Sequence, residues 1–281
     1  MAEDRLQFTF EQGGRSLTVG ANDFGIIDYS GIEGADYKIS SAERIRGVGS
    51  RYTKTRIPQR DITVTAEYKK RAGKSEMRLF LVSFFRPDEE GVLSVESAGT
   101  RRQIPYRVEG FTYKQTNIHE KLQFLAELTC LDPFFQSITR TGVSIMTLVG
   151  GWKWPFTLPF KLRQYGELKK NILNPGDVEA PVEIYFQGPA ARPKIINHRS
   201  GEYIQISRDL TASETLYINT GESVPEIEIR TEDSIEDGWA YVDPASVFWR
   251  LKPGDNMIEY SAGALRSKGV EVFYRARYLG I

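Results

Sequence analysis

The sequence predicts a mainly β protein, and three observations carry this prediction. Apolar and polar residues alternate with a period of two in many short runs, which is the pattern of half-buried strands. Glycine and proline turn signals separate these runs. One segment breaks the period and has the spacing of a helix. Many short strands joined by such turns are typical of β-sandwiches and barrels.

Alternating runs occur in both halves of the chain. In the first half they cover residues 6–11, 62–69 and 122–130. In the second half they cover residues 182–186, 226–230, 247–251 and 270–274. Turn signals stand at residues 174–177, 200–201, 220–221 and 252–255.

The segment with helical spacing predicts one helix over about residues 75–86. Ser75 is the expected N-cap, and Pro87 ends the segment. The run is apolar on nearly all sides, so a buried strand is the alternative. Its apolar residues fall at i, i+3, i+4 and i+7: Met77, Phe80, Leu81 and Phe84.

A β-hairpin is predicted after the helix, and a domain boundary further on. Two strands near residues 92–96 and 104–109 flank a turn at 97–100. At roughly 150 residues per domain, 281 residues suggest two domains. Pro133 stops the preceding strand, so we expect an N-terminal domain over 1–136 and a C-terminal domain over 137–281.

Composition and charge narrow the classes of function. Lys+Arg and Asp+Glu both number 37, so the basic excess usual in a general nucleic-acid binder is missing. A net charge of zero is compatible with self-assembly. The single cysteine, Cys130, can form neither an internal disulfide nor a thiolate metal site. We expect no signal peptide and no membrane span.

The segments that partly resemble catalytic motifs lack the residues or the spacing that the chemistry requires. Gly73-Lys74-Ser75 lacks the earlier glycine of a phosphate-binding loop, because Tyr68 stands at that position. His119 and His198 lie in turn-like segments without metal-ligand spacing. Cys130 lies on the apolar face of a strand and is expected in the core. No Gly-x-Ser-x-Gly motif occurs.

Carboxylates are the remaining candidates for catalysis, as the acid pair of a glycosidase. Such a pair needs one acid whose pKa is raised by burial. The candidates lie in turns or on outward strand faces, where water solvates them, so we expect no enzyme, no catalytic residue, no cofactor and no metal. The clusters are Asp88-Glu89-Glu90, Glu226 with Glu228, Glu232-Asp233 and Glu236-Asp237.

Basic and aromatic clusters leave two interpretations each. Basic residues at strand ends protect edges or contact a partner subunit; they are Lys69-Lys70-Arg71 with Lys74, Arg101-Arg102 and Lys169-Lys170. The aromatic residues form a sugar-binding platform or lie buried under the second sandwich; they are Trp152, Trp154, Phe156 and Phe160.

In this order, the segments resemble the distal tail protein family of long-tailed bacteriophages with non-contractile tails. The strand before the helix, the helix with its hairpin, and a strand-ending Cys-x-Asp-Pro-Phe-aromatic pattern match the family's N-terminal half. Residues 25–49 match the family pattern only loosely, and residues 152–160 are richer in aromatic side chains than this pattern. The matching segments are 60–64, 75–110, 130–135, 174–181, 197–202, 246–256 and 274–280.

The resemblance implies a structural virion protein at the tail tip, made in the host bacterial cytoplasm. It implies a ring of six copies formed by N-terminal domains, in which the helix and hairpin are the "belt" extension. The C-terminal domain is expected to be a galectin-like β-sandwich. Expected partners are further copies of the chain, the tail tube protein, the tail-associated hub or lysin protein and receptor-binding proteins. Membrane insertion and sequence-specific nucleic-acid binding are not expected.

Within this interpretation, the hairpin at 91–110 is expected to extend the sheet edge of a neighbour. The candidate ring-interface residues are Arg101, Arg102, Lys74 and Arg78. The alternative function is a carbohydrate-binding module that recognises host cell-wall sugars through Trp152 and Trp154.

Overall fold

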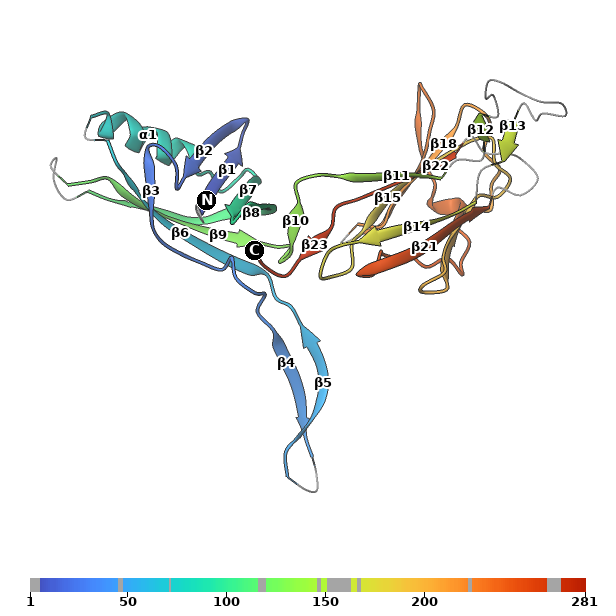
Figure 1. The fold of residues 1–281 in the computed structure, drawn as a ribbon, viewed down its shortest axis with the longest axis horizontal. Helices are drawn as coiled ribbons and strands as arrows, with labels where there is room; N and C mark the ends of the chain where they lie inside the picture. Colours follow the sequence, from blue (N-terminus) through green and yellow to red (C-terminus); the bar gives the residue numbers. More distant parts are fainter. Residues whose placement is uncertain are drawn as a thin grey trace, which may run out of the picture. The chain divides into compact units, whose positions relative to one another are not determined.

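The computed structural model divides the chain into two compact units (Figure 1). Unit 1 comprises Met1–Ile138 and Tyr278–Ile281, and unit 2 comprises Thr139–Arg277. Both are built mainly of antiparallel strands, so the predicted fold class is confirmed. The structure describes residues 6–44, 48–70, 72–115, 120–145, 148–150, 163–165, 168–221, 224–261 and 269–281.

Unit 1 is built on one curved antiparallel sheet with the strand order β2-β1-β7-β8-β9-β6-β3. The long strand β8 belongs to both halves of this sheet, because it pairs with β7 along its first part and with β9 along its second. The strands are β1 (Gln7–Gln12), β2 (Arg15–Val19), β3 (Phe24–Ser30), β6 (Arg60–Tyr68), β7 (Gly91–Ser97), β8 (Thr100–Lys114), β9 (Gln123–Cys130), β10 (Phe135–Ser137) and β23 (Arg277–Tyr278).

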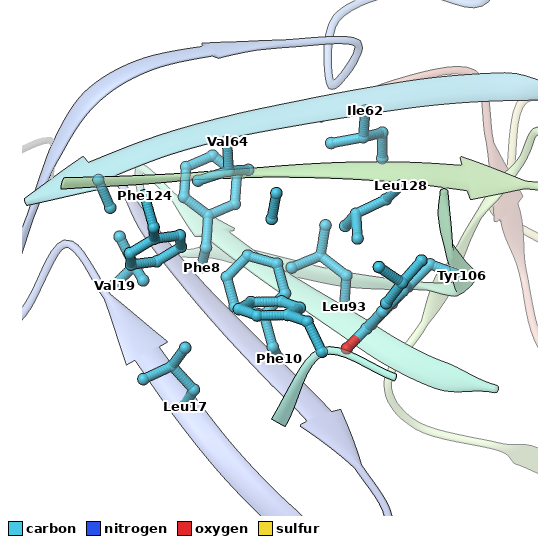
Figure 2. Packing of buried hydrophobic residues seen from close by; sticks show 14 of the residues in the cluster. Phe8, Phe10, Leu17, Val19, Ile62, Val64, Leu93, Tyr106, Phe124 and Leu128 are labelled. Atoms are coloured by element: carbon cyan, nitrogen blue, oxygen red, sulfur yellow. The ribbon is translucent and has the colours of Figure 1, made fainter. Parts of the chain in front are cut away.

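The inner faces of both halves of the sheet form one core (Figure 2). Alternate residues of each strand are buried, as the period-two pattern predicts: in β6, Ile62, Val64 and Ala66 have no exposed surface. Phe8 and Phe10 of β1 lie in the same core. Cys130 is buried there too, as predicted.

Helix α1 (Lys74–Phe84) confirms the predicted helix, but the predicted cap is wrong. Gly73 occupies the N-cap position with φ 74° and no side-chain cap bond, and Ser75 lies inside the helix. Glycine adopts this left-handed conformation without steric cost. The side chains of Leu81 and Phe84 are buried and pack the helix against the core.

The predicted hairpin forms as β7 and β8, joined by Ala98 and Gly99, which both have positive φ. However, its expected role as an edge donor is wrong. Strand β7 pairs with β1 on its other side, and β8 pairs further with β9 and β10. Most of the hairpin's backbone groups are therefore already bonded within unit 1.

A different hairpin extends away from the sheet of unit 1. Strands β4 (Lys38–Glu43) and β5 (Ser50–Arg56) pair only with each other, and every residue in both is exposed (Figure 1). We call residues 38–56 the arm. The sequence did not predict it, because strands without a buried face show no apolar alternation.

Unit 2 is a sandwich of a six-stranded sheet, β11-β22-β15-β18-β19-β20, and a four-stranded sheet, β14-β21-β16-β17. Their inner faces share a core that includes Trp249. The strands are β11 (Thr141–Ile145), β12 (Leu148–Gly150), β13 (Arg163–Tyr165), β14 (Lys169–Asn174), β15 (Val182–Gln187), β16 (Lys194–Asn197), β17 (Glu202–Gln205), β18 (Thr215–Asn219), β19 (Glu226–Arg230), β20 (Ile235–Asp237), β21 (Gly254–Ser261) and β22 (Gly269–Tyr274), with the short helix η1 (Trp239–Tyr241).

The chain passes from unit 1 to unit 2 between Ile138 and Thr139, two residues beyond the expected boundary. The return of Tyr278–Ile281 to unit 1 was not predicted. There, the Ile281 N–H donates to the carbonyl of Ile32. A Cβ on Gly280 would come within 2.3 Å of the Glu33 carbonyl oxygen, so the tail packs closely.

A carboxylate in unit 2 gives its stability a defined pH dependence. Burial raises the pKa of Glu259, but hydrogen bonds from His198 and Lys169 outweigh burial, so the pKa falls below its usual 4.5. A depressed pKa stabilises the fold above the unfolded value, and this contribution disappears as pH falls through the folded value. We expect unit 2 to lose more thermal stability between pH 6 and pH 3 in the native chain than in Glu259→Gln, measured by calorimetry. Equal losses would contradict the assignment.

Candidate interaction surfaces

The four predicted interface residues lie on two elements of unit 1, α1 and β8. Arg101 is exposed at the β7–β8 turn. Arg102 donates to the Gly280 carbonyl, and its guanidinium carbon lies 3.6 Å from the Tyr278 ring centroid, so its charge is used inside unit 1.

Lys74 and Arg78 lie on α1, and both contact their own chain. The Lys74 Nζ donates to the Glu120 carbonyl at 2.5 Å, and the Arg78 guanidinium lies over the Tyr113 ring. The predicted sugar platform, Trp152 with Trp154, Phe156 and Phe160, lies outside the described residues.

The arm has two unlike faces, which the pairing register defines. Lys38 pairs with Arg56, and Ser40 pairs with Lys54, so these three basic side chains point to the same side of the hairpin. Ile39 and Tyr52 point to the other side and are 69% and 63% exposed.

A β-bulge adds a fourth cation to the basic side. The register shifts between Ser40 and Ser41, which leaves Thr53 without an opposite residue. An extra residue reverses the alternation of the side chains that follow it. Arg51, opposite Ala42, therefore shares the face of Lys54. We call Lys38, Arg51, Lys54 and Arg56 the basic face of the arm.

A second surface lies on the outward side of strands β3, β6, β9 and β8. Asp61, Glu109 and Glu127 are exposed there, on three adjacent strands. The Thr129 hydroxyl lies 3.2 Å from Asp61 Oδ1 and 2.8 Å from Glu109 Oε2. The Glu127 carboxylate lies over Gly110, where a Cβ would approach Oε2 to 2.3 Å. We call Asp61, Glu109 and Glu127 the acidic face.

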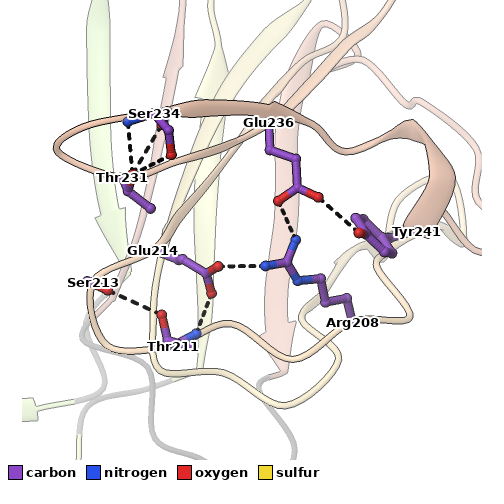
Figure 3. Close-up of polar contacts among 8 residues, drawn as sticks. All are labelled: Arg208, Thr211, Ser213, Glu214, Thr231, Ser234, Glu236 and Tyr241. Carbon is purple, nitrogen blue, oxygen red and sulfur yellow. Dashed lines mark hydrogen bonds and ion pairs between the residues drawn. The ribbon is translucent and has the colours of Figure 1, made fainter.

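Two of the carboxylates predicted as candidates for catalysis, Glu228 and Glu236, are held in ion pairs with arginine. Arg208 bridges Glu236 and Glu214, with both N–O distances at 2.7 Å, and Tyr241 donates to Glu236 (Figure 3). The hydrogen bonds from Arg208 and Tyr241 hold the pKa of Glu236 below its usual range. A general acid needs a raised pKa, so Glu236 is tuned in the opposite direction. Glu228 is paired with Arg230.

The other candidates for chemistry are accounted for by packing and surface pairing. Burial raises the pKa of the Cys130 thiol to about 12, which keeps it neutral. His198 pairs with Glu259 at 2.6 Å, and His119 lies outside the described residues. Among the described residues, the structure contains no group of three side chains that could hold a metal ion. The described part of the chain also contains no helix that meets the length and apolarity of a membrane span.

Known proteins resemble the chain in both sequence and fold. Residues 175–278 match the family model of the siphovirus-type tail component, C-terminal domain. The SPP1 Dit protein, described as a paradigm of the hub adsorption apparatus in phages that infect Gram-positive bacteria, superposes with a TM-score of 0.71. Its identity is 12%, and the match covers 97% of this chain and 99% of that one.

Two structures of the phage p2 baseplate in its activated conformation also match. One contains Sr and has a TM-score of 0.58 at 11% identity; the other contains Ca and has a TM-score of 0.54 at 12% identity. Each match covers 98% of this chain and 99% of the other chain. No curated protein matches.

The match over residues 175–278 assigns most of unit 2 to a domain family of siphovirus-type tail components. Together with the fold that the chain shares with SPP1 Dit, this match confirms the predicted resemblance to the distal tail protein family.

Proposed function

We propose that the chain forms a ring at the tail tip through unit 1 and connects the tail tube to the hub. Six copies form this ring, and unit 2, a galectin-like sandwich, docks receptor-binding proteins. The partners are further copies of the chain, the tail tube protein and the tail-associated hub or lysin protein. The exposed arm is the observation that carries the proposal.

The physical chemistry of the arm favours a partner. An isolated two-stranded hairpin is marginally stable in water. The arm adds two large apolar side chains, Ile39 and Tyr52, that water surrounds in the single chain. Contact with another molecule would bury these side chains and fix the arm. Exposed apolar groups in such a position mark interaction sites.

Ring geometry suits an element of this kind. In a closed ring of identical chains, each copy contacts its neighbour through two different surfaces. The arm supplies one surface, and a site elsewhere on unit 1 supplies the other. The names of the similar structures, a hub adsorption apparatus and a phage baseplate, support the same location for this chain.

The proposal predicts that the purified chain assembles and that the arm is required. Light scattering on a size-exclusion column is expected to give six times the 31.9-kDa chain mass. A variant with residues 39–55 replaced by a short Gly-Ser turn should be a folded monomer, because none of the described residues of the arm belongs to the core. Circular dichroism and thermal unfolding check the fold of this variant.

The matched control shortens the exposed turn at residues 232–234 in unit 2 and should leave the mass unchanged. Negative-stain images of the main peak should show rings with a central hole. A native chain that remains monomeric at every concentration, or an armless variant that still forms rings, would contradict the proposal.

A further inference from the structure

Two surfaces of unit 1 carry opposite charges that remain unpaired within the described part of the chain. One is the basic face of the arm: Lys38, Arg51, Lys54 and Arg56. The other is the acidic face of the sheet: Asp61, Glu109 and Glu127. The ion pairs found among the described residues include none of these seven side chains.

The arm is a local excess of positive charge in a chain whose net charge is zero. Residues 38–56 include six Lys or Arg and one acidic residue, Glu43. In the rest of residues 1–138, acidic residues outnumber Lys and Arg by 18 to 14. Every residue of the two arm strands is exposed, so the charges of these strands are not covered by an acidic surface in the described part of unit 1.

The acidic face has carboxylates that lack a countercharge. Asp61 and Glu109 both lie within hydrogen-bond distance of the Thr129 hydroxyl, which has a single proton to donate. One of these two carboxylates is therefore without that bond at any moment. Arg107 is the neighbouring cation on the same face, and it forms an ion pair with Glu90, with 3.5 Å between Nη2 and Oε2.

We propose that the basic face of the arm docks on the acidic face of a second copy of this chain. This inference rests on the proposed ring and names the surface that receives the arm. Charge complementarity of this kind fixes the partner and the register of an interface. The same contact repeated around the ring neutralises both surfaces in every copy, and it leaves the opposite face of the arm, with Ile39 and Tyr52, to a separate apolar contact.

The arm is long enough to reach across the acidic face. The seven residues of β5 span about 23 Å, and alternate side chains on one face of a strand lie about 7 Å apart. The acidic residues occupy three adjacent strands, which span about 10 Å. The arm therefore covers the acidic face and can place more than one cation over it at once.

A charge swap tests the docking directly. Arg51→Glu with Lys54→Glu reverses the arm, and Glu109→Lys with Glu127→Lys reverses the sheet face. All four side chains are exposed, so the fold should persist. Sedimentation equilibrium is expected to show self-association weakened about tenfold or more in each reversed variant. A chain with all four substitutions should return to within about threefold of the native affinity, because attraction is restored.

Arg192→Glu in unit 2 is the control, since it reverses an exposed cation outside the arm that takes part in none of the ion pairs found among the described residues, and it should leave association unchanged. A reversed arm that associates as tightly as the native arm would overturn the docking. A fourfold variant as weak as the single-sided ones would also overturn it. Loss of binding to a short DNA duplex, with self-association unchanged, would assign the basic face to nucleic acid instead. A native chain that never associates would contradict the ring itself, which separates the two failures.

Discussion

Replacing Arg60 with methionine is expected to destabilise unit 1 by about 3–5 kcal/mol. The Arg60 side chain is 6% exposed, and its guanidinium donates to four backbone carbonyls. These belong to Pro133 at 2.8 Å, Gly31 at 2.7 Å, Glu33 at 3.0 Å and Leu279 at 2.5 Å. Methionine fills similar space but leaves these acceptors without their donor.

Burial lowers the pKa of Arg60, yet a guanidinium remains protonated at every pH at which the protein folds. The four bonds are therefore charge-assisted and stronger than neutral ones. The free energy of unfolding of unit 1, from urea titration followed by circular dichroism, measures the effect. Arg101→Met, at an exposed site, is the control and should change stability by less than about 0.5 kcal/mol. Similar effects for the two variants would contradict the assignment.

Replacing Asn256 with leucine is expected to destabilise unit 2 by about 2–4 kcal/mol. Asn256 has no exposed surface. Its Nδ2 donates to the carbonyls of Lys252 at 2.7 Å and Gly254 at 2.8 Å, and its Oδ1 accepts from the Lys252 N–H at 3.0 Å. Leucine has nearly the same shape but cannot form these bonds, so buried backbone groups become unsatisfied.

Asn171→Leu is the matched control, because Asn171 is exposed and bonds only to the side chain of Asp255. Thermal unfolding followed by calorimetry should show a drop of several degrees for Asn256→Leu and a much smaller one for Asn171→Leu. An unchanged transition for Asn256→Leu would show that the turn holds its conformation without the side chain.

The period-two and helical patterns were sufficient to predict the core strands and the helix. Ile62, Val64 and Ala66 of β6 and Leu81 and Phe84 of α1 are buried because one face of each element packs on the core. A regular spacing of apolar residues in the sequence is the result of this packing. The pattern did not reveal the role of Asn256 in β21, because its side chain bonds to backbone groups of the preceding turn that only folding brings together.

The arm and its basic face could not be predicted in the same way. The residues of β4 and β5 are all exposed, so no apolar period marks these strands. A sequence reveals a basic cluster when the residues are neighbours, as Arg101 and Arg102 are, whereas Arg51, Lys54 and Lys38 come together only through strand pairing and a bulge. The six Lys and Arg residues among residues 38–56 were the available signal.

The return of Tyr278–Ile281 to unit 1 makes unit 2 an insertion within the sequence of its neighbour. The hydrogen bond from Arg60 to the Leu279 carbonyl can form only after the ribosome has reached Leu279, which lies 219 residues further along the chain. During translation, unit 2 can therefore complete its fold while one bond of Arg60 is still open. The final packing of unit 1 therefore depends on a segment that follows all of unit 2 in the sequence, so unit 1 cannot complete its core contacts before unit 2 has been synthesised.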